Sequence, residues 1–176
     1  TGQDGDPMET ALFNMAREAG LIPEQVRLQS PRKGEIPFDS RRKLMTTINE
    51  IEGSDIVFVK GAVDVLLKKC TRLANPAAGQ KAGTAGPGAG AAIPSRTLSS
   101  SDRQRILDQN SRWSARGLRV LAFACRPLNE AGKENGNSGY AEAKAGNSRE
   151  QSSLSGRLED DLVFLGLTAM MDPPRP

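Results

Sequence analysis

The sequence contains no histidine among its 176 residues. This absence excludes imidazole-based acid–base chemistry and histidine metal ligation. Cysteine is scarce, and its two copies, Cys70 and Cys125, lie far apart with no second thiol beside either. That spacing argues against a zinc site. Because no signal peptide is recognisable, we expect two free, buried thiols in a chain that stays in the cytosol.

Long apolar runs and glycine-rich phosphate loops are also missing. No run approaches the ~18 apolar residues needed to cross a bilayer, so a membrane role would require segments outside this sequence. Neither a G-x-x-x-x-G-K-S/T segment nor a dinucleotide fingerprint occurs, and the glycines between 83 and 90 lie in low-complexity sequence with no helix start after them. Any nucleotide must therefore be bound by side chains rather than by a glycine cradle.

Large apolar residues are thinly spread, since hydrophobic residues make up 37% of the chain and aromatic residues 4%. The deficit is concentrated near 74–101 and 129–156, which we predict to be flexible insertions open to proteolysis. The rest suffices for the core of a single domain spanning 1–176. The net charge of +3 is mild and spread along the chain, so it does not by itself indicate a nucleic-acid partner.

Hydrophobic periodicity and turn residues predict an α+β fold, a mostly antiparallel sheet with helices packed against it. The first helix is predicted from an N-cap acid, a proline and Glu9, and ends at a glycine. Gly61 is predicted to form a strand-to-helix turn, with Lys60 at that turn rather than in mid-strand. The expected helices cover 7–19, a short segment from 63 and 102–116, and the expected strands cover 27–38, 43–50, 56–59, 118–125 and 162–171.

One aromatic ring stands beside a dense cationic turn. Phe38 is followed by Arg41, Arg42 and Lys43, so that a base could stack on the ring while its phosphates met positive charge. The alternative is a buried core phenylalanine flanked by a solvated basic turn. Taken alone, the short segment favours this alternative.

Five segments, in order along the chain, bear on that choice. They are Gly5–Leu12, Ile36–Ser40 with Arg42 and Lys43, Lys60–Ala62, Gly117–Ala122, and Asp161–Gly166 with Asp172–Arg175. Together they resemble the nucleotide-binding domain of P-type cation-transporting ATPases, of the P2-like kind. One such match would be weak, whereas five in family order are specific.

The resemblance implies a binding site for the adenine base of ATP. Phe38 would stack on the base, and Glu9 would accept a hydrogen bond from its amino group. Lys60 would line the base pocket beneath Gly61, in the loop that continues to Ala62. These roles are chemically reasonable, because a carboxylate distinguishes the amino group of adenine from the keto group of guanine.

The resemblance also implies where the phosphates lie. Lys43 and Arg119 would reach toward them, and Mg2+ would arrive with the nucleotide in the full-length pump. Because Arg119 interrupts an apolar strand, we expect it to need a partner if it is buried. The chain itself offers no metal site and no catalytic residue that we can name.

The phosphate-accepting Asp-Lys-Thr-Gly motif of these pumps is absent from the sequence. Asp172 is not that aspartate, since the resemblance places 172–176 at the start of the hinge toward a missing phosphorylation domain. We therefore expect an excised cytoplasmic domain of an integral membrane protein. It should bind ATP without hydrolysing it, and its partners should be the phosphorylation and actuator domains.

Two rival functions remain open from the sequence. A separate nucleotide-processing enzyme would need a carboxylate pair or metal site, and Asp160 with Asp161 is better explained as a solvated turn. A basic regulatory or interaction module would bind an acidic partner through the turn after Phe38, without preference for adenine. The transported cation cannot be read from the sequence, because selectivity is set among membrane helices.

Overall fold

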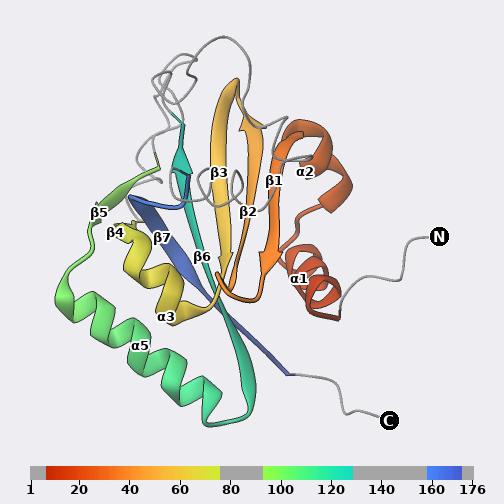
Figure 1. The fold of residues 1–176 in the computed structure, drawn as a ribbon. Helices are drawn as coiled ribbons and strands as arrows, with labels where there is room; N and C mark the ends of the chain where they lie inside the picture. Colours follow the sequence, from red (N-terminus) through yellow and green to blue (C-terminus); the bar gives the residue numbers. More distant parts are fainter. Residues whose placement is uncertain (1–6, 76–92, 129–157, 172–176) are drawn as a thin grey trace.

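A computed structural model describes residues 7–75, 93–128 and 158–171, and Figure 1 shows their arrangement. One seven-stranded sheet runs through the molecule, with α3 and α5 on one side and α1 and α2 on the other. The helices are α1 (Pro7–Glu18), α2 (Pro23–Gln29), α3 (Val63–Leu66), with a 3-10 turn at Leu67–Lys69, and α5 (Ser100–Ser114). The strands are β1 (Arg32–Asp39), β2 (Leu44–Ile51), β3 (Ser54–Gly61), β4 (Cys70–Ala74), β5 (Ser95–Thr97), β6 (Leu118–Pro127) and β7 (Leu162–Met171).

The sheet confirms the predicted α+β class. Its strand order is β1-β2-β3-β6-β7-β4-β5, and every neighbouring pair is antiparallel except β4 and β7. The first three strands form the expected meander, and β6 and β7 occupy the central positions that their apolar sequences predicted.

One face of the sheet carries the main core. Val57, Val59, Ala122 and Ala124 are buried on this face together with residues of α3. Because side chains alternate along a strand, the residues between them point to the opposite face. Lys60 follows Val59 and therefore lies on that opposite face. The register of the sheet thus decides which side chains are available for a site outside the main core.

The first helix lies where the sequence placed it, but the next segment does not. Gly20, with φ of +82°, ends α1 as predicted. The expected strand from Arg27 is wrong at its beginning, because residues Pro23–Gln29 form α2 and β1 begins only at Arg32. Pro23 at the start and Glu24 in the first turn favour this short helix.

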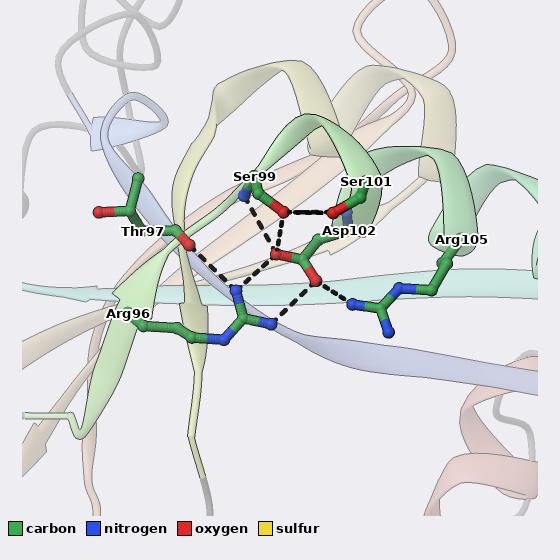
Figure 2. A network of polar contacts seen from close by, with 6 residues as sticks. All are labelled: Arg96, Thr97, Ser99, Ser101, Asp102 and Arg105. Atoms are coloured by element: carbon green, nitrogen blue, oxygen red, sulfur yellow. Dashed lines mark hydrogen bonds and ion pairs between the residues drawn. The ribbon is translucent and has the colours of Figure 1, made fainter.

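The N-terminus of α5 is fixed by a polar network (Figure 2). Ser99 caps the helix by accepting from the backbone N–H of Asp102, whose carboxylate in turn accepts from the backbone N–H of Ser99. Arg96 and Arg105 also donate to this carboxylate, which is 2% exposed. The hydrogen bond from Arg96, followed by that from the Ser99 hydroxyl, holds the pKa of Asp102 well below its usual range.

The loop predicted near 74–101 includes residues that belong to strands and a helix in the structure. Ala74 belongs to β4, residues Ser95–Thr97 form β5, and α5 begins at Ser100. The remainder of that stretch, residues 76–92, lies outside the described residues. So do the predicted insertion at 129–156 and the predicted hinge at 172–176.

Both cysteines are free and buried, as expected. Burial raises the pKa of each thiol to about 12. The thiols therefore stay protonated near neutral pH and behave as small apolar groups.

Replacing Asp102 by Asn should lower the urea midpoint of unfolding at pH 7, because the buried acceptor loses its charge beside two arginines. The folded pKa of Asp102 is lowered, so its stabilising effect is fully present above the unfolded value of about 3.9 and is lost as pH falls toward the folded value. The difference between Asp102→Asn and wild type should accordingly shrink below about pH 4. An equal difference at pH 7 and pH 3 would contradict this assignment.

Candidate functional site

Three strand ends meet at one end of the sheet, beside the middle of β6. Here β1 and β3 end and β2 begins, as the cross-strand pairs Asp39 with Leu44 and Leu44 with Gly61 show, and Gly61 pairs in turn with Ala122 of β6. In Figure 1 this is the lower end of the sheet, near α1. The structure thereby gathers at one place segments that are far apart in the sequence.

The turn between β1 and β2 is built on Asp39. Its Oδ1 accepts from the backbone N–H groups of Arg41 and Arg42, at 2.6 and 3.1 Å. These two hydrogen bonds, that from Arg42 first, lower the pKa of Asp39. The turn closes at Lys43, whose φ is +56° and whose N–H donates to the Asp39 carbonyl at 2.6 Å. A short local hydrogen-bond set thus shapes the cationic turn.

Phe38 stands at the start of this turn with 62% of its surface exposed. The sequence left open whether this ring belongs to the core, and its exposure excludes that alternative. An exposed aromatic ring beside Arg41 and Lys43, both also exposed, offers a stacking surface next to positive charge.

Gly61 and Ala62 touch the same turn through the backbone. The Ala62 N–H donates to the carbonyl of Lys43 at 3.1 Å. A Cβ at position 61 would lie 2.2 Å from that carbonyl oxygen and 2.8 Å from a methyl carbon of Leu44. Glycine is therefore required for the end of β3 to approach the turn that carries Phe38 and Lys43.

Lys60 lies inside β3 rather than at the turn after it, so that expectation was wrong by one residue. It pairs with Met45 of β2 and Phe123 of β6. Its ammonium Nζ lies 3.2 Å from Oε1 of Glu9, which is in the first turn of α1 as predicted. The pairing brings together two predicted site residues that are fifty-one positions apart in the chain.

Arg119 is placed on β6, upstream of the residue that pairs with Lys60. It is exposed, so the expected difficulty of a buried charge does not arise. Alternation along β6 puts Arg119 on the same face as Phe123, and hence on the face of Lys60. Its position is compatible with a cation near the end of the sheet where the turn lies.

Arg42 behaves differently from the other cations of the turn. Its guanidinium forms an ion pair with the buried Glu159 and also donates to the carbonyl oxygens of Pro37 and Leu44. The sequence grouped it with Arg41 and Lys43 as positive charge for a phosphate, whereas the structure gives its guanidinium partners within the protein. Sequence reasoning also missed Glu159, because nothing local connects residues that are 117 positions apart.

The acids that follow Glu159 are accounted for as well. Asp160 and Asp161 are exposed, as expected for a solvated turn, and contact Lys69 and Thr71 respectively. Within the described ranges no cluster of three or more metal-ligating side chains occurs. No helix in the same part of the chain is long and apolar enough to cross a membrane.

Comparisons with known proteins show the family to which the chain belongs. Residues 2–176 match the family described as P-type ATPase, cytoplasmic domain N. The chain is 33% identical over 171 residues to calcium-transporting ATPase 1 of Lactococcus lactis, with 97% of this chain and 16% of that protein covered. It is 34% identical over 177 residues to a calcium-transporting ATPase of Bacillus subtilis, with 98% and 16% covered.

A third relative, the cation-transporting ATPase pma1 of Synechocystis, is 31% identical over 172 residues, covering 98% of this chain and 15% of the relative. The chain belongs to the P-type ATPases and corresponds to their cytoplasmic N domain. It spans about a sixth of the length of these relatives. The family match gives no support to the interaction module that the sequence left open.

Replacing Gly61 by Ala should destabilise the domain by about 1 to 3 kcal/mol, because the added methyl group meets backbone rather than a movable side chain. Urea unfolding would measure this loss. Gly166, around which a Cβ would meet nothing within 4 Å, provides the control. If Gly61→Ala were as stable as Gly166→Ala, the close approach would not constrain the fold.

Proposed function

We propose that this domain binds ATP at the end of the sheet where β1, β2, β3 and β6 meet. The observation that carries the proposal is the exposed ring of Phe38, held beside Lys43 on a turn that packs against Gly61. An aromatic ring exposed next to a cation suits a purine nucleotide, which needs a stacking surface and a countercharge.

Glu9 and Lys60 give the base site its selectivity in this proposal. The adenine amino group donates a hydrogen bond to the Glu9 carboxylate, whereas the guanine keto oxygen at the same position would be repelled. Lys60, 3.2 Å from Glu9, fixes where this carboxylate lies before the base arrives. Gly61 and Ala62 form the wall beneath the base, where the backbone turns from β3 into α3.

Lys43 and Arg119 bind the phosphates in the same proposal. Both side chains are exposed near the same end of the sheet, so a polyanion can reach them from solvent. Mg2+ would be held by the phosphate oxygens of the nucleotide and would neutralise part of their charge. The side chains of this chain only position the complex.

The proposed partners follow from the family. The relatives named above are calcium- or cation-transporting ATPases, and we propose that the parent protein is likewise a cation pump in a membrane. The N domain would then present the terminal phosphate of ATP to a phosphorylation domain, with an actuator domain as a further partner. The isolated chain would bind ATP and not hydrolyse it, since its sequence holds no Asp-Lys-Thr-Gly acceptor.

A titration with ATP tests this function. One stacking ring and a few exposed cations predict modest affinity, with a dissociation constant of roughly 0.1 to several mM. Phe38→Ala should weaken ATP binding by ~1 to 3 kcal/mol, the usual effect of removing a base-stacking ring. Leu28→Ala is the matched control, because Leu28 is also an exposed apolar residue, at 82%, and lies on α2.

Parallel titration with GTP separates this proposal from a basic interaction surface. ATP should bind more tightly than GTP, and a Glu9→Gln variant should narrow the difference. Equal binding of the two nucleotides, together with an unchanged affinity in Phe38→Ala, would contradict an adenine site here.

A further inference from the structure

Arg42 is tied to both ends of the turn that carries Phe38 and Lys43. Its Nη2 lies 2.9 Å from the carbonyl oxygen of Pro37 and 3.3 Å from that of Leu44. Pro37 immediately precedes Phe38, and Leu44 immediately follows Lys43. One guanidinium group therefore bridges the two ends of the turn.

The strand ladder itself is irregular at this point. The register between β1 and β2 shifts between Ile36 and Asp39, where Pro37 and Phe38 stand opposite Met45 alone. Such a two-against-one arrangement interrupts the regular hydrogen bonds, and Pro37 has no N–H to donate. Contacts from Arg42 supply the tether that the ladder lacks beside Phe38.

The other side of this guanidinium is anchored in the protein interior. Nη1 of Arg42 contacts Oε1 of Glu159, a residue that is only 1% exposed. The hydroxyl of Thr46, fully buried on β2, donates to the same oxygen at 2.6 Å. These two donors fix the carboxylate, because losing Arg42 would leave its buried charge unpaired and losing Thr46 would remove one of its hydrogen bonds.

We propose that Arg42 and Glu159 are positioning residues for the nucleotide, which they do not touch. They hold the Phe38 ring and Lys43 in the arrangement that the base and phosphates require. This inference rests on the proposed ATP site. Its physical basis is that binding is stronger when the ordering of the binding turn is completed before the ligand arrives.

The planar guanidinium is needed for this role. Arginine can present separate N–H groups to Glu159, Pro37 and Leu44 at once, whereas a lysine ammonium is a compact point charge on a flexible stem. Arg42→Lys keeps a positive charge opposite Glu159 but removes the planar guanidinium. The variant therefore separates the positioning of the turn from the neutralisation of a buried carboxylate.

The matched control is Arg96→Lys. Arg96 likewise donates to a buried carboxylate, that of Asp102, here through two N–H groups and at the N-terminus of α5 rather than at the proposed site (Figure 2). Both variants should lose stability in urea. Only Arg42→Lys should raise the dissociation constant for ATP, by about tenfold, because misplaced binding groups lose affinity steeply.

A double-mutant cycle distinguishes positioning from a general structural loss. If Arg42 acts through the ring, Arg42→Lys should cost much less affinity in a Phe38→Ala background than in wild type. NMR titration with MgATP measures the four dissociation constants. Equal costs in the two backgrounds, or equal weakening in Arg96→Lys, would overturn the proposal.

Amide hydrogen exchange tests the same tether without nucleotide. In Arg42→Lys the amides of residues 38–45 should exchange faster, while those of Arg96→Lys should match wild type in this segment. Unchanged exchange of this segment in Arg42→Lys would overturn the positioning role. If wild type bound no ATP but residues 38–45 still exchanged faster in Arg42→Lys, the proposed function would be contradicted. The role of Arg42 in ordering the turn would be supported.

Discussion

The close approach of Gly61 to the Lys43 carbonyl is the constraint on which the site depends. It lets the end of β3 lie directly against the turn between β1 and β2, where any side chain would collide with backbone. The Ala62 N–H then completes the contact. The exposed ring of Phe38 on the turn and Lys60 on β3 are thereby held at one end of the sheet.

The proposed site combines a buried polar network with exposed side chains. Arg42 of the turn, Thr46 and the buried Glu159 form a polar network. Its disruption would leave an unpaired charge in the protein interior. The ion pair between Lys60 and Glu9, in contrast, is partly exposed, and such pairs contribute little to stability. The exposed pair can rearrange around a ligand at small cost, whereas the buried network keeps the turn in place.

Much of the fold was predictable because local signals agreed with the final packing. The apolar runs that became β6 and β7, and the glycine that ends α1, each determine their structure within a few residues. The short helix α2 was missed because its seven residues bury only Pro23 and carry no clear apolar period. Lys60 and Glu9 could be placed at one site only by resemblance, and their ion pair is seen only in the structure. The inward position of Arg42 depends on Glu159, which lies too far along the chain for any sequence pattern to reveal.

The most direct test is to map where ATP binds. Amide chemical shifts of the 15N-labelled chain would be followed as MgATP is added. We predict that the largest changes cluster at residues 38–43, 59–62 and 119–123, with little change near Arg96 and Arg105 at the start of α5. Changes centred on Arg96 and Arg105, or none near Phe38, would contradict the proposed ATP site.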